Sequence, residues 1–130
     1  MTALTLNLLP GRLAVAQLPA AAEFPLHWDL GSALFAFVRT PEELTVICDE
    51  SAVPAGLPVE PGWRAFRVAG PLDFSLVGVL AQITAPLAQA GVSIFAASTF
   101  STDFILVKEA RLAQAVHALK LAGMIVEEEE

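Results

Sequence analysis

The sequence is poor in the residues that build covalent and metal-bound frameworks, with one cysteine and two histidines among 130 residues. The single cysteine, Cys48, has no partner for a disulfide within the chain, and such sparing use fits a reducing compartment. His27 and His117 stand alone and share no metal-ligand spacing with Cys48, so a metal site would need several further donors. We therefore expect neither a disulfide scaffold nor a metal or other cofactor.

The sequence also lacks a basic start followed by an apolar segment, which a secretory signal would have, so we expect a cytoplasmic protein. The stretch from Phe74 to Thr102 is free of charged residues and long enough to cross a bilayer. It nevertheless contains polar residues such as Gln82 and Gln89, and its apolar period changes halfway. This pattern favours a buried helix followed by a buried strand, and it argues against a membrane partner.

Charged residues make up only 16% of the chain, and the positive ones are scattered. No basic stripe is present to neutralise phosphates, which argues against a nucleic-acid partner. The formal net charge is -7, but Glu127 to Glu130 supply four of the 14 acidic residues. We interpret this terminal run as a solvated tail and assign it no function.

Motifs for catalysis are missing as well. The sequence shows no glycine-rich phosphate loop, no nucleophile elbow and no paired catalytic carboxylates. We therefore do not expect an enzyme, and a small enzyme remains only a third alternative, since the fold predicted below also hosts catalysts.

The second half of the chain alternates between strand and helix patterns. Leu76, Val79, Leu80, Ile83 and Leu87 recur at helical spacing, with Ser75 at the predicted N-cap and Gly91 as the predicted stop. A second helical stripe ends at Gly123. The predicted strands are Trp63–Val68, Val92–Thr99, Phe104–Lys108 and Met124–Val126. This order predicts a βαββαβ unit, in which two helices cover one face of a four-stranded antiparallel sheet.

The first half is less regular. Extended segments flank the Pro10-Gly11 turn, and Ala33–Arg39 with Leu44–Cys48 forms a second predicted hairpin. Glu43–Ile47 aligns with Asp103–Val107, which indicates a weak internal repeat; alternatively, the two hairpins are merely alike. We expect an α+β fold of two ferredoxin-like βαββαβ units, the first degenerate. Residues 1–62 would form the first, with a Pro/Gly linker at 53–62, and residues 63–130 the second, with an acidic tail.

Two loops should meet at one end of the second predicted sheet: Gly70–Gly78, which leads into the first helix, and Ser98–Asp103. A helix start offers N–H groups and partial positive charge to a carboxylate, and Gly78 would allow close approach to the backbone. Asp103 could hold an ammonium group, so the pair would clamp an α-amino acid through charge-assisted bonds of roughly 1.5–3 kcal/mol each. Alternatively, Asp103 only completes a turn and Gly78 only permits helix packing.

The same segments resemble a known family. Gly70–Ser75, Leu87–Phe95 and Ser98–Val107 are similar to the tandem ACT proteins, which include the regulatory half of aspartokinases and the CASTOR arginine sensors of animal cells. The Arg39–Leu44 hairpin and Trp63 fit the first ACT unit and its boundary, so the likeness extends over almost the whole chain. Its most specific part is the serine-threonine to threonine-aspartate turn. The chain departs from the family in having no kinase domain and in its degenerate first unit.

The resemblance implies a non-catalytic regulatory module that binds an amino acid or similar metabolite at an interface between ACT units. A homodimer would complete the site, and a regulated protein partner is expected; the alternative is a ligand-free oligomerisation or adaptor domain. Carried over by matching position, the implied ligand-binding residues are Asp73, Phe74, Leu76, Val77, Gly78, Thr99, Phe100 and Asp103.

Overall fold

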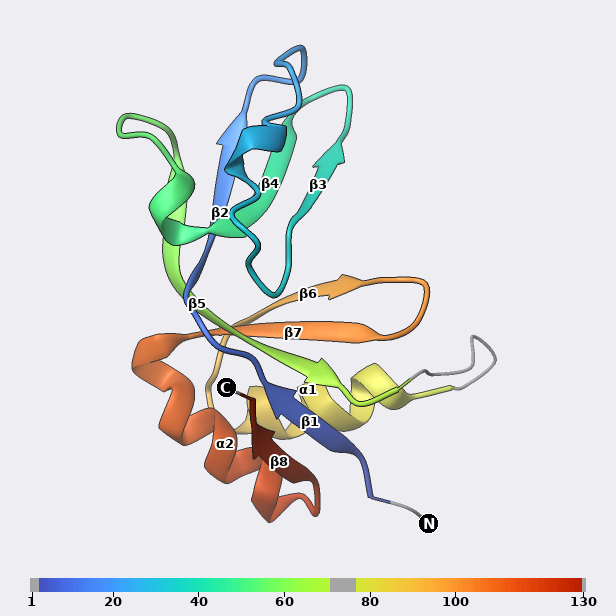
Figure 1. Cartoon of the computed structure of the whole chain (residues 1–130). Helices are drawn as coiled ribbons and strands as arrows, with labels where there is room; N and C mark the ends of the chain where they lie inside the picture. The colour runs from blue at the N-terminus through green and yellow to red at the C-terminus, as the bar shows by residue number, and fades with distance from the viewer. Residues whose placement is uncertain (1–2, 71–76, 130) are drawn as a thin grey trace. The chain divides into compact units, whose positions relative to one another are not determined.

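The computed structural model describes residues 3–70 and 77–129, and Figure 1 shows their course. The chain divides into two compact units. One, which we call the helical unit, contains Met1–Pro10 together with Arg64–Glu130; the other, which we call the strand unit, contains Gly11–Trp63. The fold is α+β, as the sequence predicted, with eight strands and two α-helices in the described part of the chain.

The strand unit contains β2 (Leu13–Leu18), β3 (Ala36–Arg39), β4 (Leu44–Asp49) and the first part of β5 (Val59–Val68). The strands lie in the order β3, β4, β2, β5, and all neighbours are antiparallel. Counted along the chain from β2, this is the strand order of a ferredoxin-like βαββαβ unit. Its two connections carry only the short 3-10 helices Leu26–Trp28 and Glu50–Ala52. The first unit is therefore degenerate, as the sequence predicted.

The core of the strand unit is small, and its buried members are Ala16, Trp28, Leu44, Val46 and Cys48. The segment from Ala20 to Leu30 has no amphipathic period, and it forms only one short 3-10 turn, which carries Trp28 into this core. The pKa of the Cys48 thiol is raised from 9.0 to about 11. Burial is the larger cause, and the negative charge of Asp49 is the smaller one. The thiol is therefore protonated at neutral pH and packs as a small apolar group.

The helical unit contains the rest of β5, both α-helices and the remaining strands. Along the chain these are β1 (Thr5–Leu8), α1 (Val79–Gln89), β6 (Ile94–Ser98), β7 (Asp103–Lys108), α2 (Leu112–Leu121) and β8 (Ile125–Glu128). In Figure 1, α1 and α2 lie together against the strands of this unit. Both helices bury apolar residues in one core, which includes Ile83 and Leu87 of α1 and Ala115 and Leu119 of α2.

The first strand of the chain lies in the sheet of the helical unit, which the sequence did not predict. β1 is antiparallel to β5 and parallel to β8, so the order is β6, β7, β5, β1, β8. The predicted four-stranded antiparallel sheet thus has a fifth strand and one parallel pair. β1 and β2 are not paired across the Pro10-Gly11 turn, because Leu6 and Leu8 are buried in the core of the helical unit instead.

The predicted boundaries differ from the observed ones accordingly. Residues 1–10 pack with the second half of the chain rather than with residues 11–62, and the division falls after Trp63. Only the first part of the predicted linker at 53–62 connects elements, because β5 already begins at Val59. Val59 and Glu60 pair with Ala16 and Val15 of β2.

Both α-helices end at the glycines that the sequence predicted. Gly91 has a φ of +75°, its N–H donates to the Ala88 carbonyl, and the Val92 N–H donates to the Leu87 carbonyl. Gly123 and Met124 make the equivalent bonds after α2. These paired bonds define the Schellman motif, whose left-handed residue favours glycine. In the described part of the chain, no helix has both the length and the apolar character needed to cross a membrane.

The two hairpins share their turn geometry. The Thr40 N–H donates to the Glu43 carbonyl at 2.9 Å, and the Thr99 N–H donates to the Thr102 carbonyl at 2.8 Å. A 3-10 helix that begins with glutamate follows β4, and another follows β7. The structure therefore aligns Thr40 with Thr99. The alignment of Glu43 with Asp103 that the sequence indicated is shifted from this by one residue.

Candidate functional site

The loop into α1 was predicted to hold one end of a ligand. Of its predicted site residues, Asp73, Phe74 and Leu76 lie outside the described residues, as does the predicted N-cap Ser75. Val77 is 94% exposed. α1 begins at Val79, later than predicted, and Gly78 precedes it with a left-handed φ of +84°. Such a φ cannot continue a right-handed helix, so it places the start of α1 directly after Gly78.

The start of α1 carries partial positive charge. The Gln82 N–H donates to the Gly78 carbonyl at 3.0 Å, which closes the first turn. The N–H groups of Val79, Leu80 and Ala81 precede that bond and lie where an α-helix leaves its donors without helical partners. A carboxylate placed there would be stabilised by these dipoles.

The second predicted segment is the turn between β6 and β7. The Ser98 hydroxyl donates to Oδ1 of Asp103 at 2.6 Å, across the last pair of the β6–β7 ladder. The Thr99 hydroxyl is used within the turn, where it donates to the Thr102 carbonyl at 3.1 Å. Phe100 lies at the tip of the turn and is 83% exposed. The turn thus fixes the Asp103 carboxylate and exposes an aromatic ring.

Asp103 lies on the helix side of its sheet. Side chains alternate along a strand, and Ile105 and Val107 of β7 belong to the core that includes Ile83 and Leu87 of α1. Asp103 shares their face, so it and α1 lie on the same side of the sheet. Two of the predicted site positions, Asp103 and the start of α1 after Gly78, therefore lie on the same side of the sheet.

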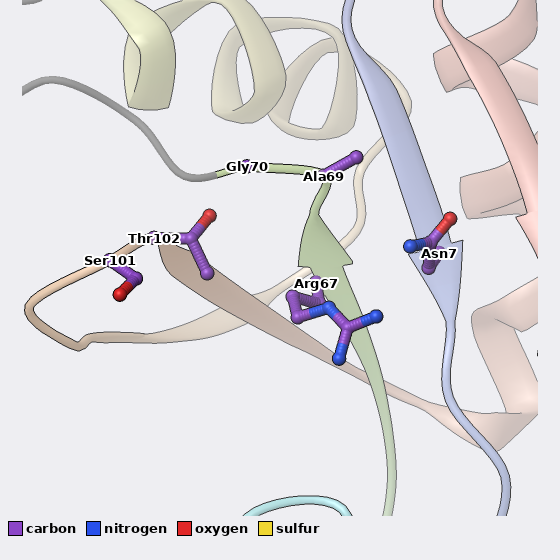
Figure 2. A pocket seen from close by; sticks show the side chains of 6 residues that line it. All are labelled: Asn7, Arg67, Ala69, Gly70, Ser101 and Thr102. Carbon is purple, nitrogen blue, oxygen red and sulfur yellow. The ribbon is translucent and has the colours of Figure 1, made fainter.

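A pocket opens in the helical unit at the point where β5 ends near the β6–β7 turn. It encloses roughly 420 Å³ and is lined by Asn7, Arg67, Ala69, Gly70, Ser101 and Thr102 (Figure 2). Asn7 and Arg67 are cross-strand partners in β1 and β5, and they alternate with Leu6, Phe66 and Val68 of the core. The two side chains therefore lie on the face of the sheet opposite the helices.

The pocket borders both predicted loops, but its lining differs from the predicted set. It includes Gly70, Ser101 and Thr102 from the two predicted segments, and its other polar residues, Asn7 and Arg67, come from strands. The Thr102 hydroxyl donates to the Val68 carbonyl at 2.6 Å and so ties the turn to β5. Asn7 lies beside Arg67 only because β1 pairs with β5, which local sequence patterns could not predict.

The acidic C-terminal run is not simply a solvated tail, which corrects our interpretation of the sequence. Glu127 and Glu128 belong to β8, and the Glu129 N–H donates to the Leu8 carbonyl at 2.8 Å. The Glu129 carboxylate accepts a hydrogen bond from the Arg67 guanidinium at 2.9 Å. Pairing with β1 continues through these residues, and it brings a carboxylate to the edge of the pocket.

The strand unit has a pocket of its own, of roughly 480 Å³, lined by Ala20, Ala21, Arg39, Thr40 and Pro41. Beside it, the Arg39 guanidinium lies over the Phe24 ring at 4.8 Å, and Phe24 stacks on Phe37 at 4.4 Å. The Arg39 guanidinium thus makes a cation–π contact with Phe24, and the two phenylalanine rings stabilise each other by stacking. Among the described residues, no three His, Cys, Asp or Glu side chains come together in a way that could hold a metal ion.

Comparison with known proteins identifies the matched region. The model of the ACT domain family matches residues 59–120. Over 96 residues the chain is 31% identical to the cytosolic arginine sensor for mTORC1 subunit 1 from Bos taurus. That alignment covers 65% of this chain but only 29% of the sensor, so the chain spans less than a third of the length of this relative.

Solved structures extend the match to the whole chain. Protein Atu0741 from Agrobacterium tumefaciens is 31% identical, with a TM-score of 0.91 over 100% of this chain and 96% of that one. The regulatory subunit of aspartate kinase from Thermus thermophilus has a TM-score of 0.58 over 86% of this chain and 91% of that one. Its identity is 13%, so this likeness concerns the fold alone.

Proposed function

We propose that this chain, whose residues 59–120 match the model of the ACT domain family, is a non-catalytic regulatory module that binds an amino acid. The ligand carboxylate would lie against the first N–H groups of α1, next to Gly78, and its ammonium group would bind Asp103. The observation that carries this proposal is the position of Asp103 on the same side of the sheet as α1. The arginine-sensing relative supports an amino acid as the class of ligand.

The site is proposed to be completed by a second copy of the chain. Val77 and Phe100 are 94% and 83% exposed, although each is a large apolar residue beside one half of the clamp. Covering them would stabilise an interface, and two-fold symmetry would create two equivalent sites. Thr99 and Phe100 would then contact the ligand from the turn, and Asp73, Phe74, Leu76 and Val77 from the loop. A cytoplasmic location and a regulated protein partner belong to the same proposal.

A thermal-shift screen of the twenty amino acids tests this function. At least one should stabilise the protein, because a ligand at 100 times its Kd adds about 2.7 kcal/mol, or roughly 5–15 °C in Tm for a chain of this size. A flat screen at millimolar concentrations would contradict amino-acid binding. A flat screen together with a co-purifying partner protein would favour the adaptor alternative, for which the exposed Val77 and Phe100 would supply contact area.

A further inference from the structure

We propose that the pocket around Arg67 is a second ligand site, which binds small monocarboxylates and in which Glu129 acts as a built-in competitor. The site lies on the face of the sheet opposite Asp103 and the helices, so it stands apart from the amino-acid site proposed above. It rests on the juxtaposition of a cavity of roughly 420 Å³, an arginine in its wall and a carboxylate of the same chain on that arginine.

Arg67 provides the recognition chemistry. A guanidinium presents five N–H groups in a planar fork that matches the two oxygens of a carboxylate. One of its terminal nitrogens already binds Oε2 of Glu129 at 2.9 Å, so a carboxylate can approach it from the direction of β8. Asn7 and Ser101 add an amide and a hydroxyl to the pocket wall, and these groups can bind the remainder of a small polar ligand (Figure 2).

The ion pair between Glu129 and Arg67 is partly exposed, so a ligand carboxylate can displace the Glu129 side chain. The Glu129 side chain is 45% exposed and that of Arg67 is 37% exposed, and ion pairs between exposed groups contribute little to stability. The backbone of Glu129 is held independently, because its N–H donates to the Leu8 carbonyl. A ligand carboxylate can therefore replace the glutamate side chain while the strand pairing persists.

The charge around the pocket selects the ligand class. The register pairs Asn7 with Arg67 on one side and with Glu127 on the other, so these three residues form a row across β5, β1 and β8. A second negative charge on the ligand would approach Glu127, which disfavours dicarboxylates. The fitting ligand has one carboxylate for Arg67 and a neutral or cationic remainder.

A heteronuclear NMR titration of the full chain tests this site with three probes of similar size. Butyrate and 4-aminobutyrate should both move the Arg67 Nε–H and the Asn7 side-chain amide resonances, and the neutral butyramide should not. Binding of 4-aminobutyrate at least as tight as that of butyrate would support the selection by Glu127. Unmoved Arg67 and Asn7 resonances at saturating butyrate would overturn the site.

Two glutamine substitutions separate competition from bulk charge. Glu129→Gln removes the competing carboxylate and should tighten butyrate binding about two- to fivefold. Glu128→Gln makes the same charge change one residue away, on the opposite face of β8, and should leave the affinity unchanged. Equal effects of the two variants would overturn the competitor role. Arg67→Gln should weaken butyrate at least tenfold, and an unchanged affinity would move the site elsewhere.

Discussion

Asp103→Ala should abolish the stabilisation by whichever amino acid raises the Tm of the parent protein. The variant removes the carboxylate proposed to hold the ligand ammonium group, and a charge-assisted hydrogen bond of this kind contributes roughly 1.5–3 kcal/mol. The affinity should therefore fall by roughly 10- to 150-fold. Isothermal titration calorimetry of both proteins with that amino acid measures the change directly.

The fold should survive this substitution, because within residues 3–70 and 77–129 the Asp103 side chain bonds only to the exposed Ser98 hydroxyl. Glu42→Ala is the matched control, since it removes one exposed negative charge from the equivalent hairpin turn of the strand unit. Asp103→Asn keeps the size of the side chain and a hydrogen bond with Ser98, and it isolates the effect of charge. Full affinity in Asp103→Ala would remove Asp103 from the site.

Leu6→Ala should destabilise the helical unit by about 2–5 kcal/mol, the range for removing a fully buried leucine side chain. Leu6 is completely buried, and it lies in β1 between Val68 of β5 and Val126 of β8. A loss of this size is a large share of the total stability of a small protein. Circular dichroism at helical wavelengths reports on this unit during urea unfolding, because both α1 and α2 belong to it.

Leu26→Ala serves as the comparison, because Leu26 is 64% exposed in the strand unit and its truncation should change the free energy of unfolding by no more than about 0.5 kcal/mol. Fluorescence of Trp28 and Trp63, both in the strand unit, follows the other part of the chain. If Leu6→Ala unfolded at the same urea concentration as the parent protein, β1 would not be part of the core of the helical unit.

Local patterns in the sequence predicted most elements of the helical unit. The apolar spacing from Val79 to Leu87 and the glycines at 91 and 123 correspond to α1 and to two helix ends with paired capping bonds. The β6–β7 hairpin also follows from alternation on either side of a short polar turn. In each case the determining residues are close neighbours along the chain, so the physical cause is visible in the sequence.

The position of β1 could not be predicted in this way. Leu6 pairs with Val68 and Val126, which are distant in sequence, and nothing in Thr5–Leu8 alone distinguishes these partners from β2. The same limitation hid the pocket, because Asn7 reaches Arg67 only through β1. The acidic run from Glu127 was misjudged for a related reason: strand pairing with β1 orders residues whose composition is typical of a solvated tail.

The most direct test of the amino-acid site is a heteronuclear NMR titration of the whole chain with the amino acid that gives the largest rise in Tm. We expect the backbone amides of Gly78, Val79 and Asp103 to shift together and to saturate with one Kd. Saturable shifts confined to other parts of the chain, with these three amides unmoved, would contradict an amino-acid site between α1 and Asp103.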